Sequence, residues 1–375
     1  DAYVDIFCFL AGELPESGGD ARLEQPVRQY AGGSSVNTAT HLHSLANNFI
    51  SEETSETKPK IMLHTVLNEH DEHGQSLLAH GKEHGFPILN CYQPADSNSP
   101  LSTGHCVAIV SKGERSFMTH QGCVGTFKAE QLDLQKIIDT VNDSHIHISG
   151  YFNLEGFHND GLKNALLQIR AQRSAKQSGT TTVSVVTQHD ASLEWDGGLQ
   201  QIMPLLDFLI MNELEANSIL RRHASGMIPE LATLEDQINA WMQYFSEWDP
   251  TTVVIVTLGA KGAIAFQNQE LVATVSPAIE ANVVDPTGAG DAFTAGFLHS
   301  LWRWNKNNGR IQDSHVSPSK DFAFKKMVWP QPAIKQALLF GCAVGTSAVT
   351  IRGASSPAEP ETIQIYYDQQ NVKIE

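Results

Sequence analysis

Residues 285–293 read DPTGAGDAF and combine two glycines, carboxylates at either end of the loop and the start of an apolar helical pattern. Gly288 and Gly290 lack Cβ atoms, so their backbone N–H groups can approach a phosphate closely. The apolar residues that continue the segment recur at helical spacing: Phe293, Phe297, Leu298 and Leu301. The loop is therefore expected at a helix N-terminus, where unpaired N–H groups and the helix dipole favour an anion.

Asp291 is the candidate base of this loop. A carboxylate beside a transferring phosphate can accept the proton of an attacking hydroxyl group, which is the chemistry that a kinase needs. A helix cap at Asp291 and a tight turn at the glycines explain the same residues. The loop by itself leaves both interpretations open.

A second glycine pair lies far upstream, in residues 31–39 (AGGSSVNTA), and it also leads into an apolar helical stretch. Together the two motifs resemble the ribokinase/PfkB family of carbohydrate kinases, which has an N-terminal GG…N signature and a C-terminal DTxGAGD signature. Residues 212–215 (NELE) are similar to the NxxE motif of that family, and residues 257–262 (TLGAKG) are similar to its nucleotide loop. The resemblance extends over nearly the whole chain.

The resemblance implies that the C-terminal motif supplies the base and the anion hole: Asp291, Gly288, Ala289 and Gly290. It implies that the sugar is held by residues near the N-terminus: Asp5, Gly32, Gly33 and Asn37. For Asp5 the alternative is a turn residue at the end of a strand. For Asn37 the alternative is a helix cap.

The resemblance also implies a nucleotide site, formed by Asn212, Thr257, Gly259, Gly262 and Cys342. Asn212 and Glu215 would share one face of a helix and order water around Mg²⁺. The alternatives are a solvent-facing helix surface for this pair, a plain strand–turn–strand for residues 257–262, and a small buried residue for Cys342. Relatives often bind a monovalent cation, and the residues that match that K⁺ site are Asp285, Thr287 and Ser356.

These residues need a scaffold that brings distant segments together. Strands are predicted at residues 61–66, 182–187, 208–211 and 252–257, and amphipathic helices at residues 162–169 and 231–245. Such alternation is typical of a parallel sheet covered by helices, whose ligands bind at the carboxyl ends of the strands. The expected fold class is α/β, a ribokinase-like three-layer α/β/α sandwich with a mainly parallel central sheet and a small β-sheet lid.

A single kinase domain is expected over residues 1–375. The lid segments are expected at about residues 7–30 and 104–119, and the second contains a hairpin signal around Lys112-Gly113-Glu114. Residues 51–60 are predicted to form a solvated loop. Residues 303–330 are predicted to form a surface insertion, marked by three lysines: Lys320, Lys325 and Lys326.

The composition argues against several classes of protein. The chain has 375 residues, of which 41% are hydrophobic and 18% charged, enough for a large core. Its net charge of −17 argues against nucleic-acid binding. The five cysteines have no CxxC spacing, which indicates neither a zinc ribbon nor a disulfide framework. No apolar run reaches the length of a membrane span. His145 and His147 alternate as in a strand and are not expected to bind a metal.

These features favour a cytoplasmic protein. The chain begins at Asp1, close to the point where the family has completed a first buried strand. We therefore expect upstream residues to be absent, and an organellar location if they contain a targeting segment.

The predicted activity is an ATP- and Mg²⁺-dependent transfer of the γ-phosphoryl group to a hydroxymethyl group of a small carbohydrate, with ribose as the first choice. Many relatives have a glutamate after the central strand, where residues 149–153 read SGYFN, so the sugar stays open. The alternatives are an adenosine-type nucleoside kinase and a catalytically silent PfkB-like regulatory or binding protein. A dinucleotide-dependent dehydrogenase is disfavoured, because the loop lacks GxGxxG spacing. The expected partners are the sugar and ATP, with the protein as a monomer or as a homodimer through the lid.

Overall fold

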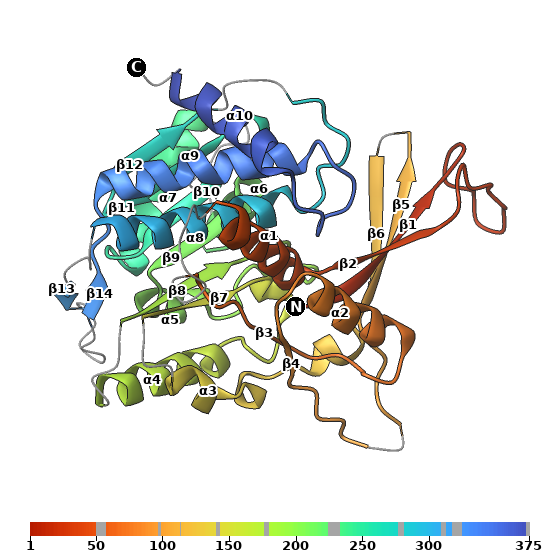
Figure 1. The fold of residues 1–375 in the computed structure, drawn as a ribbon, viewed down its shortest axis with the longest axis horizontal. Helices are drawn as coiled ribbons and strands as arrows, with labels where there is room; N and C mark the ends of the chain where they lie inside the picture. Colours follow the sequence, from red (N-terminus) through yellow and green to blue (C-terminus); the bar gives the residue numbers. More distant parts are fainter. Residues whose placement is uncertain are drawn as a thin grey trace.

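The computed structural model describes residues 1–49, 58–96, 99–112, 114–139, 143–175, 180–223, 233–276, 281–308, 313–316 and 325–372. Its centre is a six-stranded sheet in the order β12-β11-β10-β9-β8-β7 (Figure 1). The strands are β7 (Ser144–Ile148), β8 (Thr181–Val186), β9 (Phe208–Asn212), β10 (Val253–Thr257), β11 (Ala263–Gln267) and β12 (Glu270–Val275). Strands β7 to β10 run parallel, and β11 and β12 are antiparallel additions.

Helices cover both faces of this sheet, because its strands are apolar on both sides. Leu209 and Met211 of β9 lie in the core that includes residues of α4 (Asp160–Ala175), α6 (Glu213–His223) and α7 (Leu234–Trp248). Phe208 and Ile210 alternate with them along the strand. They lie in the core that includes residues of α8 (Ala289–Asn308) and α9 (Gln331–Ala348). The predicted three-layer α/β/α arrangement is confirmed.

Two further helices complete the α8–α9 side of the molecule. Helix α1 (Ser34–Asn48) packs against α8, and α10 (Pro360–Val372) packs against α9. The smaller elements are α2 (Glu72–Glu83), α3 (Leu134–Ile138), α5 (Leu199–Ile202) and a parallel strand pair, β3 (Leu63–Thr65) with β4 (Ile88–Asn90). Among the described residues, no helix is both long and apolar enough to cross a lipid bilayer.

A separate four-stranded sheet forms the lid and stands to one side of the main body (Figure 1). Its order is β2-β1-β5-β6, with β1 (Tyr3–Phe9), β2 (Arg28–Gly32), β5 (His105–Ser111) and β6 (Glu114–His120). The small lid sheet predicted with the fold class is therefore present, and β5 and β6 form the predicted hairpin. Strand β1 begins earlier than expected, so Asp5 lies inside a lid strand and is not a turn residue at a strand end.

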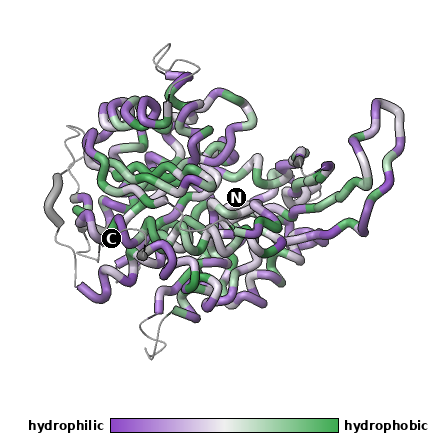
Figure 2. Tube along the Cα trace, turned by 90° about the horizontal axis from the view of Figure 1, so that it is seen from above, coloured by the Kyte–Doolittle hydropathy of each residue, from purple (hydrophilic) through white to green (hydrophobic). Residues whose placement is uncertain are grey.

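Figure 2 shows apolar residues concentrated in the main body, whereas the lid extends away from it. The predicted strands at residues 182–187, 208–211 and 252–257 agree with β8, β9 and β10. The strand predicted at residues 61–66 is shorter, and the helix predicted from residue 231 begins at Leu234, after a Thr233 cap. Most of the predicted loop at residues 51–60 lies outside the described residues.

The predicted surface insertion at residues 303–330 needs a correction. Helix α8 continues to Asn308, and the later residues include a strand pair, β13 (Asp313–Val316) with β14 (Lys325–Met327). Lys326 is only 2% exposed, because its ammonium group forms an ion pair with Asp249 at 2.6 Å. A lysine in a sequence normally indicates surface, but a buried carboxylate partner reverses that expectation here. Lys320 lies outside the described residues.

Candidate active site

The glycine loop leads directly into α8, as its sequence predicts. Gly288 has a φ of 77°, and a Cβ atom there would lie 2.6 Å from the Cβ of Ala354. Gly290 lies in the first turn of α8, and a Cβ atom there would meet no atom within 4 Å. Gly288 is therefore required by the turn itself, whereas the missing side chain of Gly290 leaves open space at the helix N-terminus.

The Asp291 carboxylate is held by two residues of α1. Ser34 Oγ donates a hydrogen bond to Oδ1 at 2.5 Å, and Asn37 Nδ2 donates one to Oδ2 at 2.8 Å. The structure thus brings the two glycine motifs together across more than 250 residues. Burial raises the pKa of Asp291 to about 6, against the opposing effect of the two hydrogen bonds. Asp291 is consequently ionised at neutral pH and able to accept a proton.

Asp5 lies in the middle of β1, opposite Tyr30 of β2. Its carboxylate lies so close to Gly32 that any Cβ atom on that residue would collide with it. Burial raises the pKa of Asp5 to about 7, with smaller contributions from the negative charges of Asp291 and Asp285. No hydrogen-bond donor within the described residues contributes to this pKa, so the carboxylate oxygens are free to accept hydrogen bonds from hydroxyl groups.

Gly33 and Asn37 complete the N-terminal group of predicted sugar ligands. Gly33 has a φ of 84°, and a Cβ atom there would lie 2.8 Å from the Cα of Ala2, so only glycine suits this close approach of two backbones. Asn37 is 4% exposed, and its Oδ1 atom has no hydrogen-bond partner within the described part of the chain. An orphaned buried acceptor is costly, and a ligand hydroxyl beside Asp291 would satisfy it.

Asn212 and Glu215 form a reciprocal cap at the start of α6. The Glu215 backbone N–H donates to Asn212 Oδ1 at 2.9 Å, and the Asn212 side chain donates to Glu215 Oε1 at 2.7 Å. Thr187 and the Asn212 backbone N–H both donate to Glu215 Oε2. Because the Glu215 oxygens are engaged in this way, the pair suits contact with a metal through water better than direct coordination. Among the described residues, no group of three or more His, Cys, Asp or Glu side chains is arranged to hold a metal ion.

The remaining nucleotide candidates lie on two elements. Thr257 is the last residue of β10, and Gly259 and Gly262 follow it with φ values of 58° and 99°. A Cβ atom on Gly259 would meet nothing within 4 Å, so this turn is open. Cys342 belongs to the apolar core between α9 and the sheet and is 7% exposed. Burial raises the pKa of its thiol to about 12, and its position agrees with the alternative of a small core residue.

Arg115, which sequence reasoning missed, joins the lid to the glycine loop. Its Nη1 atom lies 2.9 Å from Asp285 Oδ1 and also donates to the hydroxyl group of Thr287. Burial would raise the pKa of Asp285, but hydrogen bonds from the Thr287 and Gly353 N–H groups, together with Arg115, lower it overall. No signal in the sequence distinguishes Arg115 from an ordinary surface arginine of a hairpin.

The structure also places the expected K⁺ residues and the two central histidines. Ser356 lies in a turn in which its N–H group donates to the Gly353 carbonyl, next to the Asp285 loop. His145 is hydrogen-bonded to Thr182 and Ser184 of β8 at 2.8 and 2.7 Å. His147 Nδ1 is hydrogen-bonded to Ser184 at 2.7 Å, so each histidine of β7 has a partner in the neighbouring strand.

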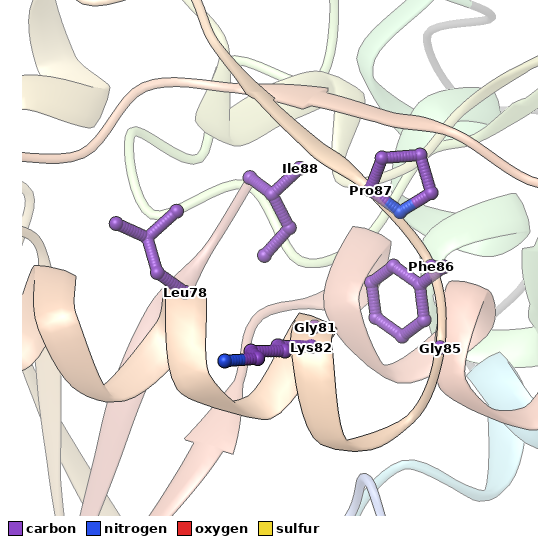
Figure 3. Close-up of a pocket in the computed structure, with 7 residues that line it drawn as sticks. All are labelled: Leu78, Gly81, Lys82, Gly85, Phe86, Pro87 and Ile88. Atoms are coloured by element: carbon purple, nitrogen blue, oxygen red, sulfur yellow. The ribbon is translucent and has the colours of Figure 1, made fainter.

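A surface hollow of about 380 Å³ lies at the C-terminal end of α2 (Figure 3). It is lined by Leu78, Gly81, Lys82, Gly85, Phe86, Pro87 and Ile88. None of these residues belongs to the candidate site, so the hollow is separate from that site.

The fold and the family assign the chain to the phosphotransferases that act on an alcohol group. It belongs to the pfkB family carbohydrate kinases, because the model of that family matches residues 10–361. Such kinases bind ATP and in general need a divalent metal.

Curated relatives are similar at low identity. The chain is 25% identical to an adenosine kinase of Schizophyllum commune over 262 residues, 68% of this chain and 72% of the relative. It is 24% identical to an adenosine kinase of Saccharomyces cerevisiae over 62% of this chain and 63% of that protein. The alignments thus span about two thirds of the length of these relatives.

Solved structures support the fold. The ribokinase of Giardia lamblia superposes with a TM-score of 0.72 at 19% identity, covering 100% of this chain and 97% of that one. The ribokinase of Arabidopsis thaliana, solved with ribose and ATP, gives a TM-score of 0.64 at 19% identity, covering 98% and 96%.

Proposed function

We propose that this protein is an ATP-dependent sugar kinase that phosphorylates a hydroxymethyl group of a small carbohydrate, with ribose as the first candidate. The observation that carries this proposal is the arrangement around Asp291. Both carboxylate oxygens of Asp291 accept hydrogen bonds, and Asp291 lies in the first turn of α8. There is open space beside Gly290 in the same turn. Asp5 faces the same region from the lid, close enough for its charge to interact with that of Asp291.

The chemistry follows from the roles of these residues. Asp291 removes the proton of the sugar hydroxyl as its oxygen bonds to the γ-phosphorus, and the bond from that phosphorus to ADP breaks. The N–H groups at Gly288, Ala289 and Gly290 stabilise the charge on the phosphoryl oxygens. Asp5, Asn37 and the close-packed Gly32 and Gly33 hold the other hydroxyl groups. The lid excludes water, which would otherwise hydrolyse ATP.

The metal assignments have unequal support. Oxygen donors at Asn212 and Glu215 fit water-mediated contact with Mg²⁺, which neutralises phosphate charge when bound. The K⁺ site expected at Asp285, Thr287 and Ser356 fits less well, because the Arg115 guanidinium already contacts the first two residues. No step of the proposed mechanism involves K⁺.

A nucleoside kinase is the second candidate, and the similarity to adenosine kinases favours it. A silent regulatory protein is less consistent with an ionised Asp291 beside intact glycines.

A substrate panel distinguishes the candidates. Phosphorylation of ribose, fructose, 2-keto-3-deoxygluconate and adenosine is measured with ATP and Mg²⁺. We expect the highest kcat/KM with a free sugar. The highest value with adenosine would establish the nucleoside kinase, and no transfer to any acceptor would support the silent protein.

The predicted oligomeric state and location stay predictions. Strand β6 is an edge of the lid sheet, and Phe117 and Met118 on it are 56% and 54% exposed. Light scattering after size-exclusion chromatography distinguishes a monomer from a homodimer formed through this edge. The cytoplasmic location is tested by imaging the tagged natural protein.

A further inference from the structure

Two buried serine hydroxyl groups form a chain that ends on Asp291. Ser34 Oγ lies 2.5 Å from Asp291 Oδ1 and also 2.5 Å from Ser149 Oγ. Ser34 and Ser149 are 1% and 2% exposed. Ser34 belongs to α1, Ser149 directly follows β7 and Asp291 belongs to α8, so the hydrogen bonds join three separate segments of the protein.

The donor and acceptor of each hydrogen bond follow from the number of hydroxyl protons available. An ionised carboxylate only accepts hydrogen bonds, so the single hydroxyl proton of Ser34 points to Asp291. The hydrogen bond between the serines must then be donated by Ser149 to Ser34 Oγ. Successive hydrogen bonds of this kind polarise one another and strengthen the bond to the carboxylate.

The Ser34 side chain does not cap its own helix, α1. A serine at the start of a helix commonly caps it through the side chain, but α1 begins after Gly33 and has no side-chain cap. The hydroxyl group is directed instead to a residue 257 positions further along the chain. Because Asn37 holds the other carboxylate oxygen, the two donors together define the plane of the Asp291 carboxylate.

We propose that Ser34, supported by Ser149, positions Asp291 and keeps it in the form that accepts the sugar proton. This inference rests on the proposed function and deepens it, since Ser34 acts through the base. Ser34 is thus a positioning residue. Its contribution agrees with the pKa of Asp291, which burial raises and the Ser34 and Asn37 hydrogen bonds lower.

The other charged groups near Asp291 are common to the wild type and to every variant of the serines. They are Asp5 on β1 and Glu215 on α6. A difference between variants therefore reports the hydroxyl group that was changed.

The test compares Ser34→Ala, Ser34→Thr and Ser149→Ala with a control, Thr40→Val. The control removes another buried hydroxyl group of α1, which bonds the Val36 carbonyl and His80 and not Asp291. kcat is measured from pH 5 to 9 with saturating ATP and the best acceptor from the panel. For Ser34→Ala we expect kcat at pH 7 to fall about tenfold or more, because a hydrogen bond to a charged group is lost.

The pH profile gives a readout that a purely structural role would not change. The acid limb of kcat should move upward by about one pH unit in Ser34→Ala, since the lost donor favoured the carboxylate. Ser149→Ala should show a smaller shift in the same direction, Ser34→Thr should restore the profile, and Thr40→Val should leave it unchanged. An acid limb unchanged in Ser34→Ala, or a shift as large in Thr40→Val, would overturn the inference.

Thermal unfolding supplies a readout that does not need activity. At pH 8, where Asp291 is ionised, Ser34→Ala should lose more stability than at pH 5, whereas Thr40→Val should lose a similar amount at both. If the wild-type protein phosphorylates no acceptor, the proposed function fails. If the wild type is active and the Ser34→Ala melts and profile match those of the control, only the positioning role of Ser34 fails.

Discussion

Asp291, the proposed base, carries an unfavourable buried charge. We predict that Asp291→Asn lowers kcat by roughly 10²–10⁴-fold, because the amide keeps the shape of the side chain but cannot accept the proton. Nucleotide binding should persist. The measurement is steady-state kinetics beside a direct ATP-binding titration, and near-normal kcat would show that Asp291 is only a cap.

The stability difference between Asp291→Asn and the wild type should depend on pH. The pKa of Asp291 is about 6 in the folded protein against an ordinary value of 3.8, so the folded state binds the proton more tightly. The protonated Asp291 side chain therefore contributes its full stabilisation of the folded state below pH 4. This contribution is lost as the pH rises through 6. At pH 8 the free energy of unfolding of Asp291→Asn should therefore be higher than that of the wild type, by up to about 3 kcal/mol. Melts at pH 4 and pH 8 test this, and a constant difference would contradict it.

The ionisation of Asp5 should make the affinity for the sugar depend on pH. Its pKa is about 7, and the ionised carboxylate accepts hydroxyl hydrogen bonds on both oxygens, whereas protonation removes the charge and turns one oxygen into a donor. The sugar KM of the wild type should fall as the pH rises through 7. Asp5→Ala should raise the sugar KM at least about tenfold and abolish this dependence, with little change in the KM for ATP. An equal weakening of ATP would show that Asp5 does not bind the sugar.

Two glycines at the start of α8 have different roles: Gly288 lies in the turn before the helix, and Gly290 lies in its first turn. Gly290→Val should abolish most activity with little change in the melting temperature, because its side chain enters open space where the phosphate would bind. Gly288→Val is the matched comparison and should lose stability as well, since it forces a positive φ and a clash with Ala354. Thermal melts and kcat measured on both variants test this distinction. Equal losses of stability would mark the whole loop as structural.

Strand β6 carries the contact that holds the lid against the glycine loop. Arg115→Ala removes the ion pair with Asp285, so water should enter more easily. We expect the ratio of ATP hydrolysis to sugar phosphorylation to rise. Lys112→Ala is the control, since its ion pair with Glu13 on the same lid is exposed and contributes little. The same ratio in both variants would show that Arg115 does not seal the site.

Across the whole molecule, the candidate nucleotide residues and a group of buried charges lie at opposite ends of the central sheet. Asn212 and Thr257 end β9 and β10, whereas Asp207 and Asp249 precede these strands and lie near Lys326. Lys326→Ala leaves Asp249 buried without its ammonium partner and should cost about 3–5 kcal/mol. The sugar and ATP KM values should stay unchanged. Chemical denaturation and kinetics test this, and a changed KM would contradict it.

The sequence by itself determined the local chemistry of the chain. Glycine content, helical spacing and apolar strands are properties of neighbouring residues, so the start of α8, the strands β8 to β10 and the lid hairpin were predictable. The resemblance of the motifs then led to the family that matches residues 10–361.

Only the tertiary structure decided which side chains meet. Ser34 reaches Asp291, Arg115 reaches Asp285 and Lys326 becomes buried, because the chain path brings these distant residues into contact. Such contacts depend on the order of the strands, on the position of the lid and on side-chain rotamers. Local periodicity encodes none of these, since it records which face of an element a residue occupies and not what packs against that face.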